Sequence, residues 1–158
     1  MDLELRLRVE DLLARYVHCI DDGRLEEWPA FFVEDGRYRI TTAENYERGL
    51  PLPIVYADSR AMLRDRVAAL RQANIYEPQR YRHVVSSILV DRVDAKTARA
   101  VSNFQVVRVM QTGESTLFAT GRCLDRVRIE GEGGRAQFEE RVVVLDSRAI
   151  DTLLAIPL

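Results

Sequence analysis

The sequence predicts an α+β fold in which helices cover one face of a curved, mostly antiparallel sheet. Three helical patterns come first, and four long segments rich in β-branched residues follow, joined by short turns. A run of helices followed by a run of strands is typical of this fold class. No repeat or linker separates the segments, so we expect residues 1–158 to form a single domain. The expected helices span 3–21, 25–32 and 58–74, and the expected strands of the run span 81–93, 97–110, 116–129 and 136–146.

The first helix is defined by an apolar stripe whose members recur every three or four residues, as on one face of an α-helix. The sequence Asp21-Asp22-Gly23 ends it, because glycine readily adopts the left-handed conformation found after a helix. The stripe consists of Leu5, Val9, Leu12, Leu13, Tyr16 and Ile20.

The next stretch, DDGRLEEWPAFFVEDGRY, is unusually rich in aromatic and acidic residues for a connection. We interpret Trp28, Phe31 and Phe32 as core residues that close the open side of the sheet, since large aromatic side chains bury much area. Asp35-Gly36 predicts a turn before a strand at 37–41. Residues 43–57 are expected to form a loop with a short extended piece at 53–56, and Asp58 or Ser59 is expected to cap the third helix.

The strand at 116–129 predicts one buried face from residues of equal parity: Leu117, Ala119, Cys123, Val127 and Ile129. Asp125 falls on the same face. A carboxylate there indicates either a β-bulge or an arginine partner.

Composition excludes several classes of function. The net charge of −2 gives no basic footprint for nucleic acid, and no run of about 18 apolar residues could cross a membrane. The N-terminus lacks the pattern of a signal peptide, so we expect a cytoplasmic chain with reduced thiols at Cys19 and Cys123. No phosphate-binding loop or nucleophile elbow is present, and two histidines with two cysteines are too few to build an iron–sulfur site together with a mononuclear iron site.

The remaining candidates for chemistry are general acids and bases. His83, Asp21, Asp35 and Tyr16 are the residues that we expect near a pocket inside the curved sheet. A His–Asp pair in such a pocket could move protons next to a carbonyl group. The alternative is that His83 is a packed histidine whose hydrogen bond is satisfied.

Several segments carry a resemblance to a known family. YVHCIDDGRLEEWPAFFVEDGRYRI resembles the N-terminal segment of the small (β) subunits of Rieske-type aromatic-ring-hydroxylating dioxygenases, and the similarity continues through GLPLPIVYADSRAMLRDRVAALRQANIYEPQRYRH and DTLLAIPL. RVAALRQANIYE and RYRH are most similar to terephthalate 1,2-dioxygenase small subunits, with salicylate 5-hydroxylase, anthranilate and benzoate dioxygenase small subunits as near relatives. The pattern W-x-x-F-F-x-x-D-x-x-Y also resembles the wider NTF2-like superfamily, which includes scytalone dehydratase and ketosteroid isomerase.

The resemblance implies an NTF2-like (cystatin-like) cone and a non-catalytic, structural role. It implies that the Rieske [2Fe-2S] cluster and the mononuclear iron belong to the α-subunit partner, and that this chain binds no cofactor. The expected assembly is a β trimer within an α3β3 hexamer. The parent reaction would be an NADH- and O2-dependent oxidation of an aromatic carboxylic acid.

Two further expectations concern surfaces and alternatives. The loop at 43–57 and a set of arginine and apolar residues are expected to contact other subunits; the set consists of Arg80, Arg82, Leu153, Leu154, Ile156 and Leu158. The alternative function is a stand-alone NTF2-like dehydratase or isomerase that uses His83 with Asp21 or Asp35. A third possibility is a binding module that holds an apolar ligand inside the cone.

Overall fold

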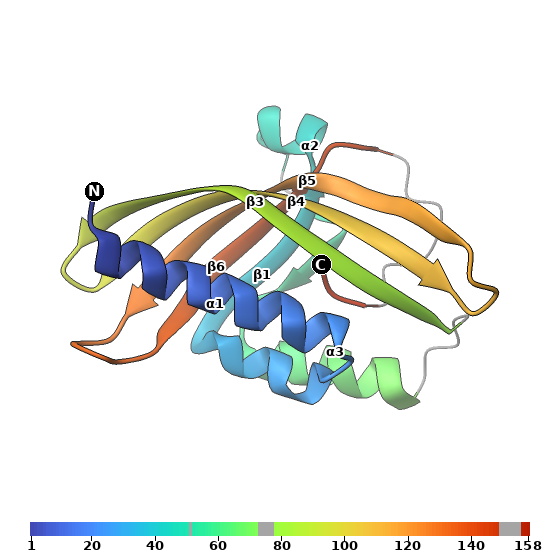
Figure 1. The fold of residues 1–158 in the computed structure, drawn as a ribbon, viewed down its shortest axis with the longest axis horizontal. Helices are drawn as coiled ribbons and strands as arrows, with labels where there is room; N and C mark the ends of the chain where they lie inside the picture. Colours follow the sequence, from blue (N-terminus) through green and yellow to red (C-terminus); the bar gives the residue numbers. More distant parts are fainter. Residues whose placement is uncertain (51, 73–77, 149–155) are drawn as a thin grey trace.

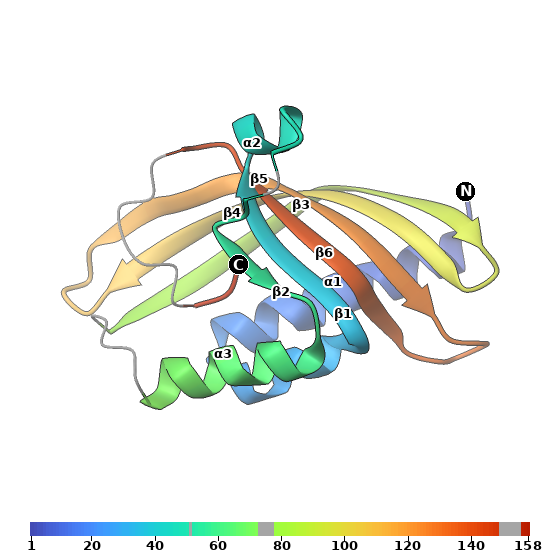
Figure 2. The same ribbon diagram turned by 180° about the vertical axis from the view of Figure 1, so that it is seen from behind.

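A curved sheet arches over the helical layer in the computed structural model, which describes residues 1–50, 52–72, 78–148 and 156–158 (Figures 1 and 2). The described strands are β1 (Phe32–Thr42), β2 (Val55–Ala57), β3 (Gln79–Asp94), β4 (Thr97–Met110), β5 (Ser115–Ile129) and β6 (Ala136–Leu145). Their order across the sheet is β2-β1-β6-β5-β4-β3. Only the β1–β6 pair is parallel among these neighbours. The predicted α+β fold class is confirmed.

Helix α1 (Leu3–Asp21) lies along the concave side of the sheet and contacts β3 and β6 (Figure 1). Its predicted stripe is buried, and the Asp2 carboxylate caps its first turn by accepting from Leu5 N at 3.0 Å. The helix ends at Asp21, and Gly23 follows with φ of 73°. The predicted start, end and buried face of this helix are therefore correct.

The connection after α1 differs from its prediction in two ways. Residues Leu25–Phe31 form a 3₁₀ helix, η1, and β1 begins at Phe32 rather than at residue 37. Asp35-Gly36 lies inside β1, where the register against β6 shifts between Phe32 and Arg37. A Cβ atom at Gly36 would lie 2.9 Å from the Val33 carbonyl oxygen. The turn signal thus marks an irregularity within a strand.

The predicted loop at 43–57 is only partly a loop. Residues Ala43–Glu47 form the short helix α2, whose N-terminus is capped by the Thr42 hydroxyl, and the extended piece is β2. Helix α3 (Arg60–Gln72) follows. The Ser59 hydroxyl accepts from Met62 N at 3.2 Å, so Ser59 rather than Asp58 caps this helix.

The predicted buried face of β5 is correct for Cys123, Val127 and Ile129 and wrong for Leu117, which is 61% exposed. Between Val106 and Val107 of β4, the partner on β5 changes from Ala119 to Leu117. Phe118 is the extra residue of this bulge and packs against the core. The bulge inverts the alternation beyond it, which places Leu117 on the outer face.

Close packing of β5 against β6 requires glycine at position 121. A Cβ atom there would lie 2.0 Å from the Val144 carbonyl oxygen. We expect Gly121→Ala to lower the free energy of unfolding by about 1–3 kcal/mol or more, because the strands must separate. Urea unfolding followed by Trp28 fluorescence measures this.

Gly131→Ala is the matched control, because nothing lies within 4 Å of a Cβ atom at that position. We expect it to change stability by less than about 0.5 kcal/mol. Equal stability of Gly121→Ala and the unsubstituted chain would contradict the close approach of β6.

Candidate functional site

The concave side of the sheet is filled by aromatic side chains. The rings of Trp28, Phe32 and Tyr38 are buried and meet edge to face, with centroids 5.2–6.0 Å apart. Such ring contacts stabilise the fold by more than the burial of their apolar area alone. The prediction that Trp28 and Phe32 belong to the core is confirmed, while Phe31 is only partly buried.

A buried ion pair lies at the centre of this filling. Arg141 Nη1 of β6 lies 2.7 Å from Asp125 Oδ2 of β5, and the two side chains are 3% and 0% exposed. The guanidinium carbon lies 4.4 Å from the Tyr16 ring centroid, and Nη2 donates to Cys123 Sγ at 3.2 Å. Asp125 therefore has the arginine partner that was one of its two predicted explanations. We call Arg141 and Asp125 the core ion pair.

Burial sets the protonation states around the core ion pair. Burial raises the pKa of Asp125 to about 6, although the charge and hydrogen bond of Arg141 act in the opposite direction. Burial likewise raises the pKa of Tyr38 and of Cys123 to about 12, and that of Tyr16 well above its usual value. The phenols and the thiol therefore stay protonated at neutral pH, and none of them is suited to act as a base.

Leu158 occupies the inside of the cone. The hydroxyls of Tyr16 and Tyr38 donate to its carbonyl oxygen at 2.8 and 3.1 Å, and its own N–H donates to the Tyr38 hydroxyl at 3.0 Å. Trp28 Nε1 donates to the Tyr16 hydroxyl at 3.1 Å. Tyr16, predicted as a pocket residue, is thus part of a closed hydrogen-bond network.

This placement corrects one prediction about subunit contacts. Leu158 was expected to face another subunit, but it is 2% exposed inside its own chain because its backbone groups pair with two buried phenols. Ile156 is partly buried against the same core. Leu153 and Leu154 lie outside the described residues. Arg80 and Arg82 are exposed on β3, where they stay candidates.

His83 and Asp21 meet between β3 and the end of α1. Asp21 Oδ1 lies 2.6 Å from His83 Nδ1, and Asp21 Oδ2 accepts from His83 N at 2.9 Å. Their side chains are 3% and 2% exposed. Asp35, the other predicted partner, is exposed on β1, which is separated from β3 by three strands. The pairing with Asp35 is therefore wrong.

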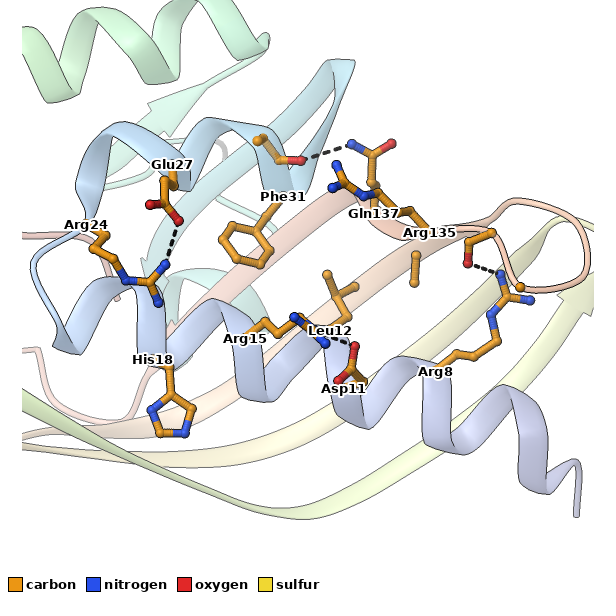
Figure 3. Close-up of a pocket in the computed structure, with 14 residues that line it drawn as sticks. Arg8, Asp11, Leu12, Arg15, His18, Arg24, Glu27, Phe31, Arg135 and Gln137 are labelled. Carbon is orange, nitrogen blue, oxygen red and sulfur yellow. Dashed lines mark hydrogen bonds and ion pairs between the residues drawn. The ribbon is translucent and has the colours of Figure 1, made fainter.

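Among the cavities on the surface of the described part of the chain, two lie near charged side chains. One, which we call the arginine groove, has a volume of about 740 Å³ and lies between α1, η1 and the beginning of β6 (Figure 3). The other, of about 830 Å³, lies beside the β3–β4 and β5–β6 turns. The groove contains Arg8, Arg15, Arg24 and Arg135, none of which was predicted as a site residue. For Arg8 and Arg15 the signal in the sequence was their helical spacing with Asp11, Leu12 and His18, whereas Arg24 and Arg135 lie outside that helix.

The His83–Asp21 pair contacts neither cavity. A carboxylate only accepts, so His83 Nδ1 is the donor to Asp21, and Nε2 is the atom left to exchange protons. That atom is buried and has no hydrogen-bond partner in the described ranges. The geometry fits a fastening of α1 to β3 better than proton exchange with a bound substrate.

The histidines and cysteines do not fit either iron centre. His18 is exposed on α1, and His83 is held by Asp21. The Cys19 thiol donates to the Arg24 carbonyl at 3.0 Å, while Cys123 contacts Arg141. No group of three metal-ligating side chains occurs within residues 1–50, 52–72, 78–148 and 156–158. No described helix is long and apolar enough to cross a membrane.

Comparison with known proteins places the chain in a family. A model of the SnoaL-like domain matches residues 1–140. Subunit beta 1 of the terminal oxygenase component of terephthalate 1,2-dioxygenase from Comamonas sp. is 44% identical over 145 residues, which cover 92% of this chain and 93% of that protein. The chain belongs to the SnoaL-like aromatic-ring dioxygenase β-subunit family. The predicted family relationship is confirmed.

Other relatives of this β-subunit chain agree. The anthranilate 1,2-dioxygenase small subunit of Burkholderia cepacia is 37% identical over 157 residues, covering 99% of this chain and 96% of the relative. A Novosphingobium aromaticivorans structure, named as the β subunit of an aromatic-ring-hydroxylating dioxygenase, has 35% identity and a TM-score of 0.86, with 96% and 95% of the two chains covered. The benzoate 1,2-dioxygenase β subunit of Burkholderia mallei, at 16% identity, TM-score 0.72 and coverage of 87% and 88%, shares the fold.

Removing one member of the core ion pair should cost more stability than removing both. Arg141→Met leaves the Asp125 carboxylate buried without its partner, and we expect a loss of about 3–5 kcal/mol in the free energy of unfolding. The double variant Arg141→Met with Asp125→Leu should be more stable than the single variant. Urea unfolding followed by circular dichroism measures both. A double variant less stable than Arg141→Met would contradict the expected cost of an unpaired buried carboxylate.

The raised pKa of Asp125 predicts a specific pH dependence. Between about pH 4 and pH 6 the folded chain binds more protons at Asp125 than the unfolded chain does, so this contribution to stability is lost as pH rises through that window. The stability of the unsubstituted chain relative to Asp125→Asn should therefore increase on acidification from pH 7 to pH 4.5, by at most about 3 kcal/mol. A relative stability that falls on acidification would show that Arg141 depresses this pKa instead.

Proposed function

We propose that the chain is the non-catalytic β subunit of an aromatic-ring-hydroxylating oxygenase and supports the assembly of the catalytic α subunits. The observation that carries this proposal is the identity to two named subunits over nearly the whole chain. It is 44% to subunit beta 1 of the terephthalate 1,2-dioxygenase terminal oxygenase component and 37% to the anthranilate 1,2-dioxygenase small subunit. In this proposal the Rieske cluster and the mononuclear iron belong to the α subunit, and the substrate is an aromatic carboxylic acid.

The filled interior of the cone supports a structural role. Trp28, Tyr16 and Tyr38 occupy the concave side with Leu158 bonded among them, and the core ion pair lies beside them. An enzyme site needs a concave space with convergent polar groups. The polar groups of Trp28, Tyr16 and Tyr38 instead bond to one another or to Leu158.

Exposed apolar residues support the presence of partners. Side chains of Leu50, Leu52, Ile54 and Tyr56 are exposed on the segment that includes β2, and Val84 and Leu89 are exposed on β3. Both β2 and β3 are edge strands, which proteins usually protect from uncontrolled pairing. We assign these surfaces, together with Arg80 and Arg82, to contacts within a β trimer and an α3β3 hexamer.

Co-expression with the α subunit encoded in the same genome tests the proposal. We expect a stable hetero-oligomer by size-exclusion chromatography with light scattering, because full-length relatives are named as subunits of an oxygenase component. Iron analysis of the separated chains should find iron only with the α subunit. Stoichiometric iron in the isolated β chain, or the absence of any complex, would contradict the proposal.

The stand-alone dehydratase or isomerase is the alternative that the same preparation can test. His83 and Asp21 form a pair of suitable chemistry at 2.6 Å, so turnover by the isolated chain that is lost in His83→Ala would favour this alternative. Asp35→Asn is the matched control, because Asp35 is exposed on a distant strand. Under our proposal neither variant affects the oxidation rate of an intact complex by direct chemistry.

A further inference from the structure

The arginine groove runs along one face of α1. Arg8, Leu12 and Arg15 line it at spacings of three and four residues, and His18 continues the series. Ten residues of α-helix separate Arg8 from His18, so this wall is about 15 Å long. Four or five residues of extended chain would span the same distance. A groove of this length suits a peptide segment better than a single aromatic ring.

The walls of the groove are tied together before any partner binds. Arg8 Nη2 donates to the carbonyl oxygens of Glu130 and Gly134, each at 2.5 Å, which joins α1 to the β5–β6 turn. Gln137 Nε2 donates to the Ala30 carbonyl at 3.0 Å, which joins β6 to η1 (Figure 3). A preformed site loses less conformational entropy on binding.

The charge of the groove is positive, although the chain carries a net charge of −2. Four arginines line it against two carboxylates, Asp11 and Glu27. Arg15 pairs with Asp11 at 2.7 Å, but both side chains are more than half exposed, and such pairs contribute little. Arg135 is exposed. Its backbone carbonyl accepts from Glu130 N at 3.2 Å, but its side chain forms no ion pair or hydrogen bond in the described ranges. Arg15 and Arg135 can therefore bind an external carboxylate at small cost.

The floor between the arginines is apolar. Leu12 of α1, Phe31 of η1 and Ala136 of β6 contribute to it, and Figure 3 shows Phe31 between η1 and α1. Phe31 is the one member of the aromatic cluster 28–32 that remains only partly buried. An apolar centre with arginines at its rim is typical of protein interfaces.

We propose that the arginine groove docks an acidic segment of the oxygenase α subunit, with carboxylates at Arg15 and Arg135 and an apolar side chain against Phe31. This inference rests on the proposed function. It adds the location of one α contact and the chemistry of the segment that makes it. The positive charge of the groove favours an acidic partner, and the length of the groove favours a peptide segment.

The test uses the full chain co-purified with its α subunit. Arg15→Glu with Arg135→Glu should raise the dissociation constant of the complex at least roughly tenfold and weaken its dependence on salt, because charge reversal opposes the proposed carboxylates. Arg64→Glu on α3 is the matched control, since Arg64 is exposed and lines neither cavity. It should change the constant less than twofold. Biolayer interferometry at 50 and 300 mM NaCl measures these values.

Further arms separate the possible failures. If the unsubstituted chain binds no α subunit, the proposed function fails; if it binds and the double variant binds equally well, only the groove assignment is overturned. If the groove binds benzoate or terephthalate, if that binding is lost when Arg135 is substituted, and if the complex with α is unchanged, the ligand of the groove is a small carboxylate and the groove assignment is overturned. If the double variant changes only the self-association of the β chain, the groove binds a second β copy and the groove assignment is overturned. If circular dichroism shows that the double variant is misfolded, Arg135→Gln replaces it. This variant should raise the dissociation constant of the complex roughly threefold or more.

Discussion

The need to satisfy one buried guanidinium organises the inside of this molecule. Arg141 is nearly inaccessible, and a buried charge is tolerated only with a partner and further contacts. Asp125 supplies the opposite charge from the neighbouring strand, Cys123 accepts a hydrogen bond, and the Tyr16 and Phe138 rings lie against the guanidinium plane. These contacts come from α1, β5 and β6, so the pair fixes the helix against the two central strands of the sheet.

The contacts of Arg141 determine what else fits inside the cone. Tyr16 must present its ring to the guanidinium, and its hydroxyl then lies where it accepts from Trp28 and donates to Leu158. Tyr38 completes the binding of Leu158 from β1. The polar groups of Tyr16, Tyr38, Trp28 and Leu158 are thereby used within the chain. On the surface, the arginine groove and the exposed edges of β2 and β3 offer charge and apolar area for binding.

Sequence reasoning succeeded where a residue's environment follows from its own element. The stripe of α1 and the limits of β4 follow from periodicity, and Asp125 required an explanation because it interrupts an apolar face. Sequence reasoning failed where the environment of a residue depends on segments that are distant in the chain. One inserted residue at Phe118 inverted the parity of Leu117, which no local pattern reveals. The choice between Asp21 and Asp35 depends on strand order, and the burial of Leu158 depends on two phenols more than 100 residues away.

The same fold in a solved structure of low sequence identity helps to separate architecture from function. A Novosphingobium aromaticivorans protein named as a scytalone dehydratase has a TM-score of 0.71 with this chain at 19% identity, over 98% of this chain and 91% of that one. A likeness at that level carries the fold alone, so function must be argued from the residues. In the described part of this chain, Tyr16, Tyr38 and Trp28 bond to one another or to Leu158 inside the cone. The arginine groove and the exposed apolar side chains of β2 and β3 lie on the outer surface. That distribution is the one expected of a rigid subunit that acts by binding other subunits through its surface.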